Sequence, residues 1–225
     1  METREEFLAG VLARLIGDAR HVAVGAASPI PAMAAFLQRE KLGGSPRISL
    51  LHQRRGNPFV DGSRELFDMA GQGRIDVFFL GGGQIDGEGA INLVHAGGKR
   101  FPGSFGSAYM YSVIPGTILF REEHSRRVLV PKVEFVSATG KPKALLTGMA
   151  LFAWQADKRR FRLESVHPDF TAADVERNTG FAYDVEARVP ETPPLSPEER
   201  LLMKNVVAKR MAESYPEFAR RVWGA

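Results

Sequence analysis

Two glycine-rich segments are the places in this chain where residue types and spacing could do chemistry. The first, Gly81–Asn92, reads GGGQIDGEGAIN and follows the apolar run Ile75–Leu80. The second, Gly103–Ala108, reads GSFGSA. Glycine lets backbone N–H groups approach an oxyanion or a phosphate without an intervening Cβ, and α/β proteins bind ligands beyond the carboxyl ends of their strands. Both segments are therefore candidates for a ligand site.

The elements that must position these loops alternate between short apolar strands and helices. Thr3 and Glu6 form a capping-box pattern for a helix that extends to about Leu15. Further helices are expected over residues 32–40, 62–73, 171–178 and 196–212. Strands are expected over residues 21–25, 47–51, 75–80, 117–120 and 128–136. The mostly apolar run Ala144–Trp154 fits either a strand pair or a buried helix. This alternation predicts an α/β fold.

Composition narrows the classes of function. The chain has 225 residues, of which 44% are hydrophobic and 25% charged, which suits one sizeable α/β domain. The net charge of +4 is mild and interspersed, so it does not indicate nucleic-acid binding, although it favours an anionic ligand. The lack of cysteine excludes a disulfide or a thiol nucleophile, and His95, His124 and His167 lack metal-ligand spacing. No apolar run is long enough for a signal peptide or a membrane span, so we expect a cytoplasmic protein without a membrane partner.

The two glycine segments resemble the B (beta) chain of two-subunit family I CoA-transferases, closest to the glutaconate CoA-transferase type. The matching stretches are GGGQIDGEGAIN at Gly81–Asn92, RFPGSFGSAY at Arg100–Tyr109 and RRVLVPKVEFVSA at Arg126–Ala138. Two outlying stretches, His21–Pro31 and His167–Phe181, follow the same family order. The resemblance covers approximately residues 20 to 190.

The resemblance implies a fold and a partner. The fold is a CoA-transferase-like α/β domain over residues 1–190, with an open, largely parallel sheet flanked by helices. Residues 191–225 are expected to form a linker and a helix that packs on the same domain. The implied partner is a homologous A-type subunit, with the active site at the interface. The implied substrate is an acyl-CoA thioester, and no permanently bound cofactor is expected.

The resemblance also assigns roles to the two loops. Gly103, Ser104, Gly106 and Ser107 correspond to a loop beside the thioester, where backbone N–H groups stabilise the oxygen that becomes negative during attack. The alternative for this loop is a tight turn before a helix. The residues of the first segment are expected to form a structural loop of the acyl-CoA cleft, in which Asp86 and Asn92 brace the loop rather than react. They are Gly82, Gly83, Gln84, Asp86 and Asn92.

One position departs from the family pattern. The strand that here is Arg47–Leu51 ends in the family with a glutamate, whose carboxylate attacks the thioester and carries CoA. In this chain His52 stands there, and the next acid is Asp61. His52 is therefore the candidate catalytic residue, with a structural role as the alternative, and a histidine cannot form the same glutamyl thioester. Arg54 and Arg55 could pair with a carboxylate or a CoA phosphate, or be solvated, and Glu88, between two glycines, is a poor substitute nucleophile.

Three functions remain open. The overall sequence favours the B-type half of a CoA-transferase. The missing glutamate favours a CoA-thioester hydrolase or a C–C bond-cleaving, ring-opening enzyme, because some relatives without this glutamate act on ring-derived CoA thioesters with a carboxylate from the A-type partner. The third alternative is a non-catalytic partner subunit. The acyl group stays open, because its pocket would be shared with the other chain.

Overall fold

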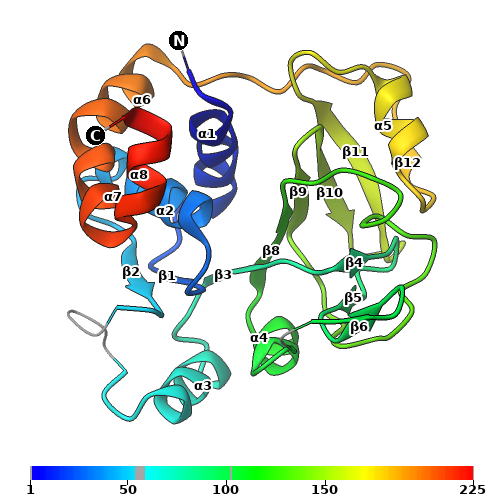
Figure 1. Ribbon diagram of the computed structural model, residues 1–225, viewed down its shortest axis with the longest axis horizontal. Coiled ribbons are helices and arrows are strands. Elements are labelled where there is room, and N and C mark those ends of the chain that lie inside the picture. The colour runs from blue at the N-terminus through cyan, green and yellow to red at the C-terminus, as the bar shows by residue number, and fades with distance from the viewer. Residues whose placement is uncertain (1, 54–58, 102, 225) are drawn as a thin grey trace. The chain divides into compact units, whose positions relative to one another are not determined.

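The computed structural model of this chain describes residues 2–53, 59–101 and 103–224 (Figure 1). Arg54 and Arg55 lie outside these residues, so their predicted pairing stays a prediction. The chain divides into two compact units. Unit 1 comprises Met1–Leu66, Arg74–Val77 and Pro193–Ala225, and unit 2 comprises Phe67–Gly73 and Phe78–Thr192. The division at residue 190 that the sequence suggested stays a prediction.

Unit 1 begins with two helices and two parallel strands. Helix α1 (Arg4–Ile16) has the predicted capping box, because the N–H of Glu6 donates to Thr3 Oγ1 and the N–H of Thr3 donates to Glu6 Oε2. Helix α2 (Pro29–Lys41) begins three residues earlier than expected, since prolines are compatible with the first helical turn. Strand β1 (His21–Val24) pairs in parallel with β2 (Arg47–Leu50), in a register that places His21 opposite Arg47. The apolar side chains between α1 and α2 are buried and form the core of this unit.

The C-terminal part of unit 1 is helical. The expected helix over residues 196–212 is present but is divided into α6 (Pro197–Leu202), a π-helical turn η1 (Met203–Val207) and α7 (Ala208–Ser214). Pro216 starts the last helix, α8 (Pro216–Trp223). In Figure 1 these helices, drawn orange to red, belong to the same unit as the blue α1 and α2. The two ends of the chain therefore share one core.

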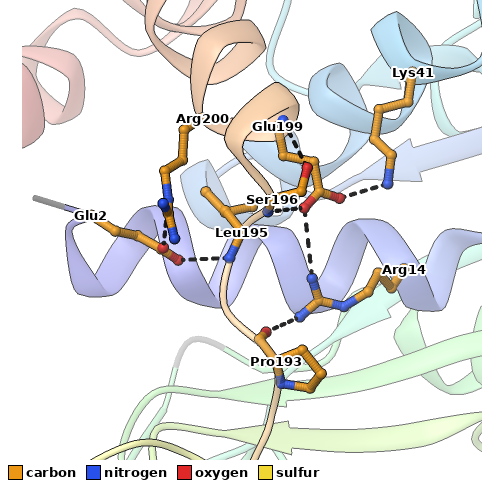
Figure 2. A network of polar contacts seen from close by, with 8 residues as sticks. All are labelled: Glu2, Arg14, Lys41, Pro193, Leu195, Ser196, Glu199 and Arg200. Carbon is orange, nitrogen blue, oxygen red and sulfur yellow. Dashed lines mark hydrogen bonds and ion pairs between the residues drawn. The ribbon is translucent and has the colours of Figure 1, made fainter.

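A buried carboxylate fixes the start of the C-terminal helices (Figure 2). Glu199 accepts hydrogen bonds from Lys41 Nζ at 2.6 Å and from the backbone N–H of Ser196 at 2.8 Å. Arg14 lies 3.9 Å from the same carboxylate and donates to the carbonyl oxygen of Pro193 at 2.6 Å. Burial raises the pKa of Glu199, but the hydrogen bonds from Lys41 and Ser196 outweigh it and leave this pKa below its ordinary value. The carboxylate therefore joins α1, α2 and α6 as an anion.

Unit 2 contains most of the strands. Their order is β12-β11-β10-β9-β8-β3. The strands are β3 (Val77–Leu80), β8 (Gly116–Arg121), β9 (Ala144–Thr147), β10 (Ala150–Gln155), β11 (Arg160–Val166) and β12 (Asp184–Val185). Pairs β8–β9 and β11–β12 are parallel, whereas β9–β10 and β10–β11 are antiparallel. The predicted α/β class, with an open, largely parallel sheet flanked by helices, is confirmed.

Smaller elements of unit 2 surround the glycine segments. Two short hairpins pair β4 (Gln84–Ile85) with β5 (Ile91–Asn92) and β6 (His95–Ala96) with β7 (Lys99–Arg100). Helices α4 (Ser107–Val113) and α5 (Ala172–Asn178) lie within unit 2. Helix α3 (Ser63–Gly71) crosses the boundary between the units in sequence. Across the described helices, none has the length and apolar character needed to cross a membrane.

Two expectations about strands have a definite outcome. The run Ala144–Trp154, for which strand pair and helix were both open, is the pair β9 and β10. The expected strand over residues 128–136 is wrong. Only an isolated bridge forms there, between Leu129 and Ile85. Pro131 lacks the N–H that a continuing ladder would use, so the pairing stops after Val130 donates to Ile85.

Candidate functional site

Close packing explains why two positions of the first glycine segment are glycine. A Cβ at Gly82 would lie 2.7 Å from the carbonyl oxygen of Gln84, and a Cβ at Gly83 would overlap the ring of Phe101. Side chains are therefore excluded at both positions by neighbouring atoms. This explanation needs no ligand, and the place of these glycines in an acyl-CoA cleft stays a prediction.

Polar side chains hold this segment to Glu134 and to the residues that follow β5. Gln84 donates to Glu134 Oε1 at 2.8 Å, and Asn92 donates to Gln84 Oε1 at 2.9 Å. Asn92 Oδ1 accepts the N–H groups of Val94 and His95. The backbone N–H of Gly97 and the Gln84 amide hold the pKa of Glu134 below its ordinary value. The fully buried Asn92 thus has its hydrogen-bonding capacity used within the loop.

Asp86 also acts on the backbone. Its Oδ1 accepts the N–H groups of Glu88 at 3.1 Å and Ala90 at 3.0 Å, and its Oδ2 accepts the N–H of Val133 at 3.3 Å. The carboxylate is 5% exposed. A nucleophilic carboxylate needs a free oxygen directed at the substrate, whereas both oxygens of Asp86 are engaged. Asp86 and Asn92 therefore have contacts that brace the loop, and their role in an acyl-CoA cleft stays a prediction. Glu88 is exposed in the turn that Asp86 holds.

The second glycine segment contains two different kinds of glycine. Gly103 has φ +103°, a conformation that a residue with a Cβ rarely adopts, and apart from its chain neighbours no described atom lies within 4 Å of the Cβ position. Gly106 has φ −88°, which any residue adopts, but a Cβ there would overlap the ring of Phe67. Phe105 between them has φ +45° and is 81% exposed. The loop is thus defined by backbone conformation at one end and by packing at the other.

Not every N–H of this loop is available to a substrate oxygen. The N–H of Ser107 donates to the carbonyl oxygen of Ser104 at 2.8 Å, which closes the turn before α4. The carbonyl oxygen of Gly106 accepts the N–H of Met110 within the first turn of that helix. The turn expected as the alternative is therefore present. An oxyanion role stays a prediction, and the N–H groups of Ser104, Phe105 and Gly106 are its candidates.

His52, the candidate catalytic residue, belongs to unit 1 and follows β2 closely. Its Nε2 lies 3.1 Å from the carbonyl oxygen of Ser214, and its ring centroid lies 4.5 Å from that of Tyr215. A carbonyl oxygen only accepts, so Nε2 carries the proton and Nδ1 of the neutral ring is an acceptor. Burial raises the pKa of Tyr215 to about 12. The ring of His52 is thus anchored to the end of α7, and its catalytic role stays a prediction.

Sequence reasoning missed a buried histidine cluster in unit 2. His124 Nδ1 lies 2.7 Å from Thr147 Oγ1, and His167 Nε2 lies 3.0 Å from the carbonyl oxygen of Thr147. His124 Nε2 also contacts Thr179 Oγ1 at 3.0 Å. Burial lowers the pKa of His124 to about 4. Both rings are buried, so the two histidines join strand ends inside the core, and no spacing in the sequence signals this. In the described part of the chain, no group of three or more metal-binding side chains is placed to hold a metal ion.

The sequence of this chain is similar to those of two curated proteins. No protein-family model matches it. It is 29% identical over 141 residues to the B chain of the 3-oxoadipate CoA-transferase of Pseudomonas knackmussii, covering 53% of this chain and 54% of that protein. It is 27% identical over 135 residues to the B chain of the glutaconate CoA-transferase of Acidaminococcus fermentans, covering 50% of each. The chain therefore spans about half the length of the curated relatives that it matches.

Solved structures match over a greater length. A chain of the decarboxylase AibA/AibB has a TM-score of 0.78 at 25% identity, with 100% of both chains covered. A chain of the glutaconate coenzyme A-transferase from Acidaminococcus fermentans has a TM-score of 0.76 at 20% identity, covering 93% of this chain and 96% of that one. The second match shows the fold alone. The resemblance to B-type chains of CoA-transferases that the sequence motifs suggested is thereby confirmed.

Proposed function

We propose that this chain is the B-type half of a two-subunit enzyme that acts on acyl-CoA thioesters and is active only with a homologous A-type subunit. The observation that carries the proposal is the sequence match to the B chains of two CoA-transferases. A cytoplasmic location and the absence of a permanently bound cofactor remain part of the prediction.

A second candidate, a CoA-thioester hydrolase or C–C bond-cleaving enzyme, is favoured by the residues after β2. Stepwise CoA transfer through an enzyme thioester needs a carboxylate on the enzyme. His52 stands where the family has that carboxylate, and the next acid, Asp61, forms an ion pair with Arg64 at 3.2 Å. Decarboxylation breaks a C–C bond, and a structural match that covers both chains fully is to a chain of a decarboxylase. Without a thioester on this chain, the substrate must react directly or on the partner.

His52 can contribute to this chemistry through Nδ1. Because Nε2–H is directed to Ser214, Nδ1 is the atom that can accept a proton from water or orient a carboxylate of the partner. The glycine loop Gly103–Ser107 supplies the candidate N–H donors for a developing oxyanion.

The first experiment tests assembly. The chain is co-expressed with its A-type neighbour and passed over a size-exclusion column, where we expect a stable complex. A monomer that ignores the A-type chain would refute the proposed subunit. The complex is then supplied with acyl-CoA with and without an acceptor acid, and the products separate CoA transfer from hydrolysis and decarboxylation. No turnover from a stable complex would favour the non-catalytic alternative.

The second experiment tests the missing carboxylate. The complex is incubated with acyl-CoA and then with borohydride or hydroxylamine, both of which react with an enzyme thioester. We expect activity to survive, and peptide mass spectrometry to find no modified carboxylate on this chain. A trapped Asp or Glu on this chain would restore the transferase mechanism.

A third measurement separates the two roles of His52. His52→Phe keeps an aromatic ring against Tyr215 but removes both nitrogens, so we expect unfolding stability to change by roughly 1 kcal/mol or less. If Nδ1 acts on substrate or orients the partner, kcat should fall about a hundredfold. Unchanged kcat would leave His52 with a structural role alone.

A further inference from the structure

A cavity in unit 2 is lined by basic side chains. It has a volume of about 540 Å³, within the range of small-molecule sites. Lys158 and Arg159 line it from the turn between β10 and β11, Arg160 from the start of β11, and Lys132 from the segment after Pro131. The buried Phe181 also lines this cavity. Segments far apart in the sequence thus bring four cations to one small space.

Two of the four cations are already compensated. Lys158 Nζ lies 2.6 Å from Asp184 Oδ2, and Arg160 Nη1 lies 3.1 Å from Asp184 Oδ1. The Lys158 hydrogen bond, followed by those from Gln155 and Arg160, holds the pKa of Asp184 well below its ordinary value. One carboxylate therefore serves two cations, which leaves positive charge in excess on this side of the cavity.

The other two cations, Lys132 and Arg159, are exposed. Within the described residues, neither has a carboxylate within ion-pair distance. Arg159 has φ +51°, the left-handed conformation that glycine or asparagine occupies more readily, at a cost on the order of 1 kcal/mol. The turn therefore contains an arginine at a position where the backbone conformation favours glycine or asparagine.

Two further acids, Asp86 and Glu88, line the cavity, and within the described residues neither forms an ion pair with Lys132 or Arg159. Asp86 lines it, but its two oxygens accept the backbone N–H groups of Glu88, Ala90 and Val133. Glu88 is exposed at the rim, in the turn that Asp86 braces. Arginine offers a planar fork that matches phosphate oxygens, and lysine adds a mobile point charge.

We propose that this cavity binds a phosphomonoester of nucleotide size, held mainly by Lys132 and Arg159, with Phe181 beside the apolar part of the ligand. The phosphate can belong to the nucleotide end of a CoA thioester, in which case the inference rests on the proposed function and extends it, or to a free nucleotide. The chemistry at the two cations is the same in both cases.

Isothermal titration calorimetry on the full chain at low salt tests the proposal, with adenosine 3′,5′-bisphosphate as the first probe. We expect saturable binding that weakens as salt is added. Lys132→Gln combined with Arg159→Asn should weaken it at least tenfold, because asparagine keeps the left-handed turn while both charges are lost. Arg188→Gln is the matched control, since it removes an exposed cation of the same unit that does not line the cavity.

The source of the phosphate is resolved by CoA and 3′-dephospho-CoA. If CoA and the bisphosphate bind and dephospho-CoA binds only weakly, the site holds the 3′-phosphate of CoA. If the bisphosphate binds and CoA does not, the site holds a free nucleotide. Absence of saturable heat with all probes at millimolar concentration, or equal affinity of the double variant and the parent chain, overturns the proposal. Because the readout is binding, failure of the proposed enzymatic function leaves this result intact.

Discussion

Gly106 allows a sharp test of why the second glycine segment contains glycine. A Cβ at this position would overlap Cε1 and Cζ of the Phe67 ring, while the backbone conformation, φ −88° and ψ 10°, accepts any residue. We predict that Gly106→Ala lowers the free energy of unfolding by about 1–2 kcal/mol. Overpacking costs about 1–3 kcal/mol, and alanine at an N-cap costs up to about 1 kcal/mol more than glycine. Alanine also restricts the unfolded chain, which stabilises the folded state by about 0.4–1 kcal/mol, and the partly buried Phe67 ring can move.

A double-mutant cycle shows whether the Phe67 ring is the cause. Leucine at position 67 lacks the two ring atoms that the new Cβ meets, so in a Phe67→Leu background Gly106→Ala should cost less than about 0.5 kcal/mol. Urea unfolding followed by circular dichroism gives all four free energies. Gly103→Ala is the control, because its cost comes from φ +103° and not from a neighbour, so Phe67→Leu should not reduce it. Additive costs for Gly106→Ala and Phe67→Leu would refute the packing explanation.

The same cycle separates an oxyanion role of the loop from the packing effect at Gly106. Gly106→Val, the direct way to block the loop, disturbs packing against Phe67 and so lowers activity under either explanation. A double variant at positions 67 and 106 removes the overlap with the ring. If the assembled enzyme that carries it still loses about a hundredfold in kcat, the loop supplies an oxyanion donor. Full activity in that variant would leave the loop as a turn.

Two further predictions concern buried side chains, the ionised Glu199 and the neutral His124. Glu199→Gln removes the anion that joins three helices and should cost about 1–3 kcal/mol in urea unfolding, whereas Glu198→Gln, at the exposed neighbouring position, should change stability by less than about 0.5 kcal/mol. His124, whose pKa burial lowers to about 4 from 6.5, contributes stability that is complete above pH 6.5 and is lost as the pH falls towards 4, up to about 3 kcal/mol. His124→Gln should flatten that part of the stability-against-pH curve, and an unchanged curve would contradict the assignment.

Local rules predicted the features whose causes lie within a few residues. The capping box of α1 and the start of α6 at Ser196 were readable because cap and partner are three residues apart. The helix after Thr171 was readable for the same reason, and Thr171 and Asp174 form its capping box. In each case the side chain meets its own backbone, so no tertiary contact is needed to specify it.

Features that depend on distant residues were not readable. The expected strand over residues 128–136 is apolar enough to be one, but only the partner at Ile85 shows that pairing stops at Pro131. His124 and His167 are 43 positions apart and meet at Thr147 through the sheet. The sequence shows the glycine segments, but it does not show why each glycine is there. Only the structure shows that a neighbouring ring excludes a Cβ at Gly106, whereas a positive φ favours glycine at Gly103.

His52 shows how far a position in a family pattern can carry a functional argument. The resemblance predicts that it stands at the position of the family's nucleophile, and the structure adds that its Nε2–H is directed to Ser214, 162 residues later. That bond fixes the ring and leaves Nδ1 as the acceptor, which suits a base or an orienting group but not a carrier of CoA. Asp86, the acid of the first glycine segment with a buried carboxylate, has both oxygens engaged by backbone N–H groups. If the assembled enzyme uses a carboxylate on the thioester, these contacts argue against Asp86 as its source, and the proposed A-type subunit is then a candidate to supply it.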